Sequence, residues 1–237
     1  MSSPEPRPQS APKLSEGEAH ARDECIREIH AANDAASFWE QLYRGKGSVW
    51  KDTANPLLAE TARHLTPGHA LDLGCGEGGD TLWLATHEWH VTAVDIAPTA
   101  LQRTSRLAAR NGLESSVRTE QHDLAETFPS GTFDLISAQY LQTPYAFPRA
   151  GVLRRAAHAL TPGGILLIVD HGSVRPWAWN TDPDTRFPSP EDIYDELALD
   201  TARWTPQRLA TPQRVATGPG GQTATVTDTV VAVRRLP

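Results

Sequence analysis

Hydrophobic and polar positions divide the chain into stretches with different periods. From residue 69 to residue 172, short apolar runs alternate with segments whose apolar residues recur at helical spacing. Strands that alternate with helices are typical of a parallel sheet with helices on both faces. We predict strands at residues 69–74, 90–96, 116–124, 132–140 and 165–172, and helices at residues 80–87, 98–111 and 149–160.

The last part of the chain has a different pattern. A short helical segment at residues 190–199 is followed by two segments, 204–215 and 223–235, in which polar and apolar residues alternate. A Gly-Pro-Gly-Gly turn at residues 218–221 joins them, as in a hairpin. We therefore predict an α/β, Rossmann-like fold whose seven-stranded, mostly parallel sheet has an antiparallel edge strand at its C-terminal end.

The part of the chain before residue 69 carries helical rather than strand patterns. Residues 1–14 are rich in proline and polar residues and are expected to form a disordered tail. Residues 15–68 are expected to form a helical N-terminal cover, and residues 69–237 the core domain. Within the cover we predict helices near residues 16–33, 35–43 and 56–64.

Composition narrows the functional classes. The chain of 237 residues has a formal net charge of −7 and no long run of Lys and Arg, so we expect no nucleic-acid partner. Its two cysteines, Cys25 and Cys75, are too few for a disulfide framework or a zinc site, and we predict no metal. No apolar stretch has the length of a membrane span or the form of a signal peptide, which favours a cytoplasmic protein with no membrane partner.

A glycine-rich turn follows the first predicted strand. Residues 71–79 read LDLGCGEGG, in which Gly74, Gly76 and Gly79 have the G-x-G-x-x-G spacing of a dinucleotide-binding turn. Asp95 follows Gly74 by 21 residues, about where such folds place the acid that binds the ribose. One hypothesis is therefore a nicotinamide-dependent oxidoreductase, and a tight turn without a ligand is its structural alternative.

Carboxylates close three of the predicted strands. Asp72, Asp95 and Asp123 lie where the first three strands end, and ligands of open α/β sheets bind at this edge. Negative charge there repels a pyrophosphate but suits ribose hydroxyls, an exocyclic amine and an ammonium group. Asp72 stands two residues before the first glycine, where the phosphates of a dinucleotide would lie. A cationic ligand without phosphates fits this edge better.

Five motifs in series resemble those of the class I S-adenosylmethionine-dependent methyltransferases. In chain order they are LDLGCGEGG, VTAVDIA, HDL, FDLISAQY and LTPGGILLIVD. The resemblance covers about residues 35–235. It implies S-adenosylmethionine (S-adenosyl-L-methionine) as the cofactor and methyl transfer to a sulfur, nitrogen or oxygen of a small molecule or peptide. A non-catalytic methyltransferase-like binding domain is the remaining alternative.

The resemblance also implies roles for particular residues. The glycine turn would lie against the methionine end and the ribose of the cofactor, Asp95 would hold both ribose hydroxyls, and Ile96 would pack on the adenine. Asp123 would lie near the adenine amine. The positions implied to bind the cofactor are Trp39, Tyr43, Trp50, Asp72, Gly74, Cys75, Gly76, Asp95, Ile96, Asp123, Leu124 and Gln139.

The segment FWEQLYRGKGSVWKDTANPLLAE, at residues 38–60, resembles the N-terminal segment of the thiopurine and tellurite-resistance type of small-molecule methyltransferases. In that type, an aromatic helix and loop fold over the bound cofactor. Trp39, Tyr43 and Trp50 would then cover the sulfonium, because an aromatic face attracts a cation. As an alternative, the i, i+4 spacing of Trp39 and Tyr43 is also typical of core residues on one helix.

Candidate acceptor residues follow the fourth and fifth predicted strands. His171 ends the fifth strand and is a candidate general base, whereas Tyr140 lies at the usual acceptor rim of the family and is a second catalytic candidate. As alternatives to these roles, His171 would be a plain loop residue, and Trp177 and Trp179 would pack in the core. The net charge mildly favours a neutral or cationic acceptor. Arg175 and Arg186 are able to bind an acidic one, but a plain surface position is the default for an arginine. The expected substrate-binding residues are Tyr140, Gln142, His171, Trp177 and Trp179.

Residues 142–145 read QTPY, which is similar to the Asn/Asp-Pro-Pro-Tyr motif of enzymes with this fold that methylate adenine or glutamine amides. In those enzymes the motif directly follows the fourth strand, where this chain has residues 139–142. QTPY comes three residues later and lacks the leading Asn or Asp, so we reject a DNA- or protein-amide methyltransferase. Neither the identity of the acceptor nor the oligomeric state follows from the sequence.

Overall fold

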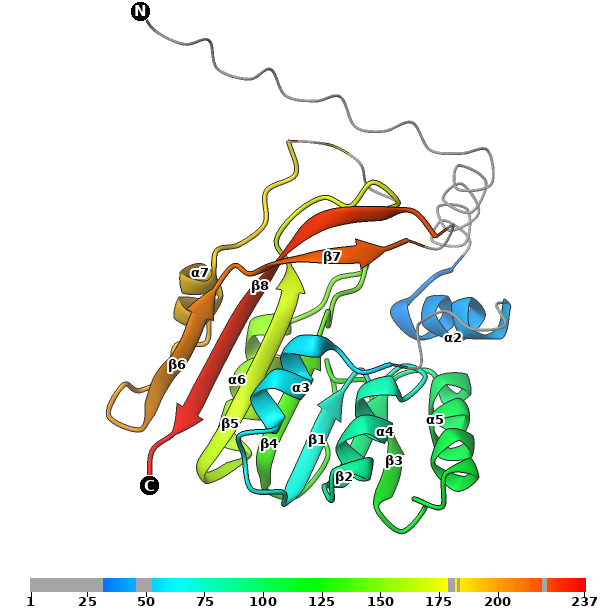
Figure 1. Ribbon diagram of the computed structural model, residues 1–237, viewed down its shortest axis with the longest axis horizontal. Coiled ribbons are helices and arrows are strands. Elements are labelled where there is room, and N and C mark those ends of the chain that lie inside the picture. Colours follow the sequence, from blue (N-terminus) through cyan, green and yellow to red (C-terminus); the bar gives the residue numbers. More distant parts are fainter. Residues whose placement is uncertain (1–31, 46–52, 179–181, 183, 219–220) are drawn as a thin grey trace, which may run out of the picture.

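Figure 1 shows the chain as a computed structural model, which describes residues 32–45, 53–178, 182, 184–218 and 221–237. The predictions for residues 1–31, namely the disordered tail and the first helix of the cover, lie outside the described residues, as do Trp50 and Trp179. Among the helices of the described ranges, none is long and apolar enough to span a membrane. The cytoplasmic location stays a prediction.

An eight-stranded mixed sheet forms the centre of the fold. Its strand order is β3-β2-β1-β4-β5-β8-β6, and β7 pairs with β8. The first five strands in this order, β3, β2, β1, β4 and β5, are parallel, whereas β8 runs antiparallel to β5, β6 and β7. This arrangement confirms the predicted Rossmann-like sheet with an antiparallel C-terminal edge. The strands are β1 His69–Leu73, β2 His90–Asp95, β3 Val117–Gln121, β4 Phe133–Gln139, β5 Leu160–His171, β6 Trp204–Ala210, β7 Gln213–Thr217 and β8 Thr223–Arg235.

The predicted number of seven strands is wrong, because the alternating segment 204–215 forms parts of two strands. Pro212 lies between β6 and β7, and proline has no amide hydrogen to donate to a neighbouring strand. Its carbonyl instead accepts a hydrogen bond from Asp228 N at 3.0 Å. β8 is 13 residues long, so its first half pairs with β7 and its second half with β6.

Helices cover both faces of the sheet, as the alternating pattern predicts. On one face, Val152 and Leu153 of α6 and Ile193 of α7 belong to the same buried cluster as the adjacent strands. On the other face, Leu58 of α3 and Leu84 of α4 do the same. Within the described ranges the helices are α2 Ala35–Gly45, α3 Pro56–Ala62, α4 Gly79–Thr86, α5 Pro98–Arg110, α6 Arg149–His158 and α7 Pro190–Glu196.

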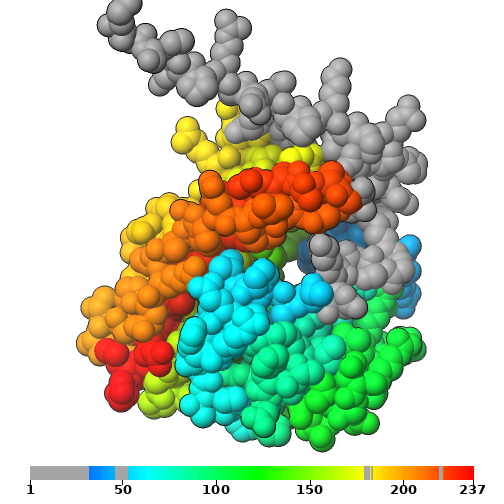
Figure 2. Space-filling model, in the orientation of Figure 1, coloured from blue at the N-terminus to red at the C-terminus, as the bar shows by residue number. Residues whose placement is uncertain are grey.

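The helix α2 packs beside the N-terminal end of α5, on the side of the molecule toward which the parallel strands point (Figure 1). Glu40 on α2 accepts hydrogen bonds from N and Oγ1 of Thr99, at 3.0 and 2.7 Å. Arg103 on α5 donates from Nη2 to the carbonyl of Tyr43 at 2.6 Å. Figure 2 shows a hollow between α2, α3 and the C-terminal strands that arch above them.

Candidate functional site

The turn after β1 brings bare backbone to the carboxyl edge of the sheet. Gly74 N and Cys75 N both donate to the carbonyl of Val94 on β2, at 2.9 Å each. Gly74 has a φ of 71° and Gly76 a φ of 54°, a left-handed conformation that favours glycine. The third glycine of the sequence pattern, Gly79, is the first residue of α4. The turn therefore presents peptide groups rather than side chains to a ligand.

The variant Gly74→Ala is expected to lose about 1–3 kcal/mol in free energy of unfolding. A Cβ at Gly74 would lie 2.9 Å from Leu141 Cδ1, in addition to the unfavourable backbone conformation. Urea denaturation measures the loss. Gly112→Ala is a matched control, because Gly112 has a φ of 67° but no atom within 4 Å of its Cβ position. A loss at Gly74 no greater than at Gly112 would contradict the close approach of Leu141.

Asp95, the last residue of β2, joins the glycine turn to the start of α5. Its Oδ2 accepts a hydrogen bond from Gly76 N and its Oδ1 one from Ala97 N, each at 3.0 Å. The side chain is buried, and burial raises the pKa of its carboxyl. Because a carboxylate has about four acceptor positions, Asp95 is able to hold the turn and also bind the hydroxyls of a ligand.

Two acidic residues, Asp72 on β1 and Asp80 on α4, meet beneath the glycine turn. Asp72 is 2% exposed and accepts a hydrogen bond from Thr81 Oγ1 at 2.6 Å. Burial, and then repulsion by Asp80, raises the pKa of Asp72 to about 7. Burial raises the pKa of Asp80 to about 6, although Asn55 N donates to its Oδ1 at 2.6 Å. A cation would relieve this repulsion, so the corner suits a positively charged ligand.

The aromatic residues of α2 differ in exposure. Tyr43 is 3% exposed and packs against Ala97 and Ala100, which is the core packing that the i, i+4 spacing also predicts. Trp39 is partly exposed, and its ring centroid lies 6.3 Å from that of Tyr43. Of the two, Trp39 has the surface that a ligand would meet. Their role in covering a cofactor stays a prediction.

The remaining cofactor candidates lie around the ends of β1, β2 and β3. Ile96 is partly buried directly after β2. Asp123 is exposed, and its Oδ1 accepts a hydrogen bond from Ala125 N at 2.9 Å. Leu124 and Cys75 are 6% and 8% exposed, and both belong to buried apolar clusters. A ligand at this edge would therefore meet Leu124 and Cys75 through their backbone.

The end of β4 holds a buried polar atom that has no hydrogen-bond partner within the described part of the chain. Gln139 donates from Nε2 to Ser137 Oγ at 2.8 Å, while its Oε1 accepts no hydrogen bond. Ser137 is the register partner of Asp72 on the neighbouring β1, which brings Gln139 close to the glycine turn. Because a buried acceptor without a donor costs free energy, Gln139 Oε1 is suited to a donor on a ligand, such as an ammonium group.

Tyr140 and His171, the two catalytic candidates, lie face to face. Their ring centroids are 4.2 Å apart, and the ring planes are inclined by 23°. Tyr140 has a φ of 52°, which is uncommon for a residue other than glycine, and its amide donates to the carbonyl of Val169 at 2.7 Å. This turn of the backbone directs Tyr140 across the end of β5, and the structure therefore brings the two candidates together.

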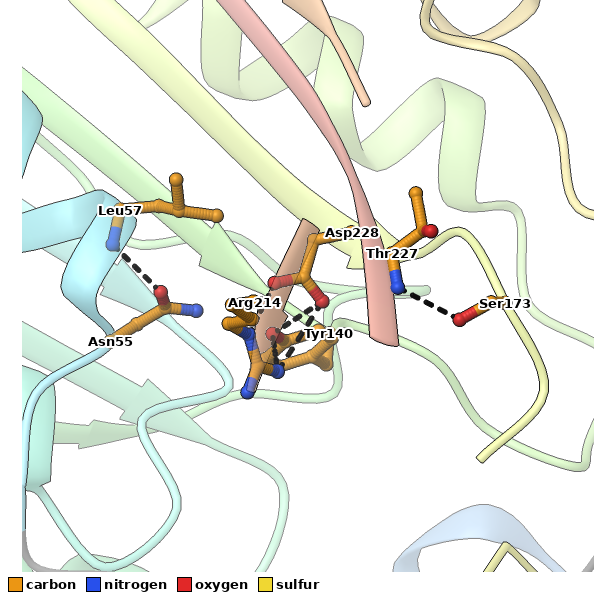
Figure 3. Close-up of polar contacts among 7 residues, drawn as sticks. All are labelled: Asn55, Leu57, Tyr140, Ser173, Arg214, Thr227 and Asp228. Carbon is orange, nitrogen blue, oxygen red and sulfur yellow. Dashed lines mark hydrogen bonds and ion pairs between the residues drawn. The ribbon is translucent and has the colours of Figure 1, made fainter. Parts of the chain in front are cut away.

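An ion pair between Arg214 on β7 and Asp228 on β8 anchors the hydroxyl of Tyr140 (Figure 3). Arg214 donates from Nε to Asp228 Oδ2 at 2.5 Å and from Nη2 to Oδ1 at 3.3 Å. Tyr140 OH donates to Asp228 Oδ1 at 3.0 Å and accepts a hydrogen bond from Arg214 Nη2 at 2.9 Å. Sequence reasoning missed Arg214 and Asp228, because 88 residues separate Tyr140 from Asp228. An Asp inside an otherwise Val- and Thr-rich strand was the available signal.

Burial and neighbouring charges fix the protonation states of the stacked pair. Burial, and then the charge of Asp228, raises the pKa of Tyr140 to about 12. Burial, and then the charges of Arg175 and Arg214, lowers the pKa of His171 to about 3. At neutral pH Tyr140 is therefore a protonated donor and His171 a neutral imidazole. A base with so low a pKa takes protons only from groups that ionise readily, which restricts the acceptors that it is able to assist.

The other acceptor candidates have surroundings that differ from those of the stacked pair. Gln142 is exposed. Trp177 is partly buried and lies over the hairpin between β7 and β8, where a Cβ at Gly218 would be 2.6 Å from Trp177 Cδ2. Asp170, although adjacent to His171, pairs with Arg149 of α6 on the opposite face of the sheet. The role of each in binding an acceptor stays a prediction.

Residues 70–164 match a family model described as a methyltransferase domain. Over 109 residues the chain is 33% identical to the ubiquinone biosynthesis O-methyltransferase of Xylella fastidiosa. This match covers 44% of this chain and 42% of that protein. Over 51 residues it is 41% identical to the ribosomal RNA small subunit methyltransferase C of Alcanivorax borkumensis, covering 22% of this chain and 16% of that protein.

The chain spans about half or less of the length of the curated relatives that it matches. Two of these relatives, from Alcanivorax borkumensis and Pseudomonas fluorescens, are ribosomal RNA methyltransferases. The absence of a nucleic-acid partner therefore stays a prediction.

Solved structures share the fold over most of the chain. A structure from work on the conversion of a disulfide bond into a thioacetal group during echinomycin biosynthesis has a TM-score of 0.66 and 25% identity, covering 85% of this chain and 93% of that one. TehB from Haemophilus influenzae has a TM-score of 0.61 and 16% identity, covering 84% and 67%. The likeness to TehB shows the fold alone, so the predicted kinship of the N-terminal cover with the tellurite-resistance type stays a prediction.

Proposed function

We propose that the chain is a class I S-adenosylmethionine-dependent methyltransferase, which transfers a methyl group to a nucleophilic atom of a small molecule or peptide. S-Adenosylmethionine supplies this methyl group on a positively charged sulfur. The acceptor atom contributes the electron pair of the new bond, and a proton on that atom leaves to a base or to water. The domain match and the O-methyltransferase relative support this reaction class.

The observation that carries the proposal is the set of oxygen acceptors around the glycine turn. Asp72 and Asp95 are buried beside bare backbone, and Gln139 Oε1 is buried without a donor among the described residues. Their oxygens fit the hydroxyls, the ammonium and the sulfonium of S-adenosylmethionine. They do not fit a pyrophosphate, which buried carboxylates would repel. This favours methyl transfer over the nicotinamide-dependent alternative.

For the acceptor we favour a sulfur atom over nitrogen or oxygen. A thiol has a pKa near 8.5 and loses its proton without a strong base. That requirement matches a site in which the pKa of His171 is about 3 and that of Tyr140 about 12. The structural relative from echinomycin biosynthesis belongs to a conversion of a disulfide into a thioacetal, in which sulfur also reacts.

The affinity for S-adenosylmethionine is expected to rise with pH across neutrality. Ionised Asp72 attracts the cationic ligand, and a pKa of about 7 leaves this carboxyl mostly protonated in mildly acidic solution. Between about pH 6 and about pH 8 we therefore expect the Kd, measured by calorimetry, to fall about tenfold. A wild-type Kd that is constant or rises over this range would contradict the role of Asp72.

Two controls accompany this titration. Asp72→Asn keeps an oxygen that accepts from Thr81 but cannot ionise, so its Kd should be weak and nearly independent of pH. In the ligand-free wild type, the raised pKa of Asp72 means that the folded state favours the protonated carboxyl. The free energy of unfolding should therefore fall as the pH rises from about 4 to about 7, opposite to the trend in affinity.

A transfer assay tests the proposed activity. The full chain is incubated with S-adenosylmethionine and a panel of thiols, amines and phenols, and mass spectrometry measures the methylated acceptor and S-adenosylhomocysteine together. We expect both products to form in equal amounts with thiols. Binding of the cofactor without transfer to any member of the panel would instead support the non-catalytic alternative.

A further inference from the structure

The polar cluster beside His171 contains two guanidinium groups and one carboxylate. Both oxygens of Asp228 accept hydrogen bonds from Arg214, and Tyr140 OH adds a third donor to Oδ1. Asp228 is 1% exposed, so its charge is enclosed by these partners. The negative charge of Asp228 therefore compensates the positive charge of Arg214. No carboxylate of the cluster remains to compensate the second guanidinium, that of Arg175.

Arg175 lies in the loop that follows β5, and this loop is fixed against β8. Gly172 N donates to the carbonyl of Thr227 at 2.9 Å, and Thr227 N donates to Ser173 Oγ at 2.8 Å (Figure 3). The loop thus runs alongside the residue that precedes Asp228. Arg175 is partly buried, and in the described part of the chain its guanidinium has no hydrogen-bond or ion-pair partner.

His171 lies within the field of both guanidiniums. Arg175 follows His171 in the loop that is anchored to β8, next to the residue that precedes Asp228. Its charge lowers the pKa of His171 more than that of Arg214 does. The groups that face His171 are Tyr140 directly after β4, Arg175 from the loop after β5, and the Arg214–Asp228 pair from β7 and β8. With a neutral imidazole and a neutral phenol, the cluster has a net charge of +1, although the whole chain has a net charge of −7.

We propose that Arg175 binds a carboxylate of the methyl acceptor, so that the substrate is a small acidic molecule or a peptide with a free carboxyl group. The inference rests on the proposed methyl transfer and narrows its substrate class. Arg presents a fork of donors that matches a carboxylate, and a partly buried, unpaired guanidinium favours such a partner. The local charge thereby reverses the preference for a neutral or cationic acceptor that the net charge of the sequence suggested.

A bound carboxylate would also change the neighbouring imidazole. It would offset the charge of Arg175, which otherwise disfavours protonation of His171. The pKa of His171 would then rise toward its ordinary value, and the imidazole would become a better base for the proton of the acceptor. An acidic substrate would therefore raise the pKa of His171, the base that receives the proton of that same substrate.

Calorimetry on the complex with S-adenosylhomocysteine tests the carboxylate site. The probes are thiosalicylate, which has a carboxylate beside its thiol, and thiosalicylamide, which has an uncharged amide at the same position. We expect the acid to bind at least about tenfold more tightly than the amide, from charge-assisted hydrogen bonds to Arg175. Arg175→Gln should remove this difference. Arg110→Gln is the matched control and should retain it, because Arg110 is an exposed residue at the end of α5.

Equal binding of acid and amide, no binding of either up to millimolar concentration, or a preference that survives in Arg175→Gln would each overturn the carboxylate site. A proton NMR titration measures the pKa of His171, which should be higher in the thiosalicylate complex than in the thiosalicylamide complex or without a probe. An unchanged pKa would overturn the placement of the carboxylate beside His171. Failure of S-adenosylhomocysteine itself to bind would instead refute the proposed methyl transfer, so the two failures are distinguishable.

Discussion

Replacing Asp95 with asparagine is expected to weaken the binding of S-adenosylmethionine at least about a hundredfold, since hydrogen bonds to a charged group are worth about 1.5–3 kcal/mol. Asp95 already holds the glycine turn through Gly76 N and the start of α5 through Ala97 N. The amide of asparagine keeps one oxygen acceptor but loses the charge and the second oxygen. Calorimetry measures the Kd, and thermal unfolding verifies that the variant folds.

Asp200→Asn is the matched control for this change. Asp200 is exposed in the turn before β6, where its Oδ1 accepts a hydrogen bond from Ala202 N at 2.9 Å. The same chemical substitution there should leave the Kd unchanged. If Asp95→Asn bound the cofactor as tightly as Asp200→Asn, the carboxylate at the end of β2 would not be part of the binding site.

Asp228→Ala is expected to have the largest effect on stability, with a loss of about 3 kcal/mol in free energy of unfolding. The substitution removes the partner of Arg214 and the acceptor of the Tyr140 hydroxyl at a position that is 1% exposed. A guanidinium without its carboxylate, in a partly buried setting, then remains uncompensated. Urea denaturation monitored by tryptophan fluorescence measures the change.

A surface ion pair provides the comparison. Arg208 on β6 and Glu60 on α3 are 3.2 Å apart, with side chains that are 32% and 57% exposed. Arg208→Gln should change the free energy of unfolding by less than about 1 kcal/mol, as is usual for exposed pairs. Similar losses in the two variants would show that the Arg214–Asp228 pair behaves like a surface contact rather than the anchor of Tyr140.

The central strands and the glycine turn could be predicted because their signals are local. Most of the apolar run 165–172, namely residues 165–170, is buried in the sheet, and such a run is recognised in the sequence without any distant partner. Gly74 and Asp95 follow from the same logic, since each stands where a parallel strand ends. The carboxyl ends of such strands meet at one edge, so residues distant along the chain could be assigned to one place.

The acceptor side could not be predicted to the same depth because it depends on tertiary contacts. Tyr140 receives its partners from β7 and β8, and the break that separates β7 from β6 falls at Thr211 and Pro212. The shift in the pKa of His171 arises from charges on a loop and on another strand. Tyr43 shows the converse problem, because its spacing fits both a cofactor contact and the packing against α5 that the structure contains.

Binding of S-adenosylmethionine by isothermal titration calorimetry tests the central claim most directly, with the reduced nicotinamide cofactor as the competing ligand. We predict saturable binding of S-adenosylmethionine in the micromolar range, binding of S-adenosylhomocysteine at the same site, and no binding of the nicotinamide cofactor. Binding of the nicotinamide cofactor, together with no heat of binding for S-adenosylmethionine or its demethylated product, would contradict the account.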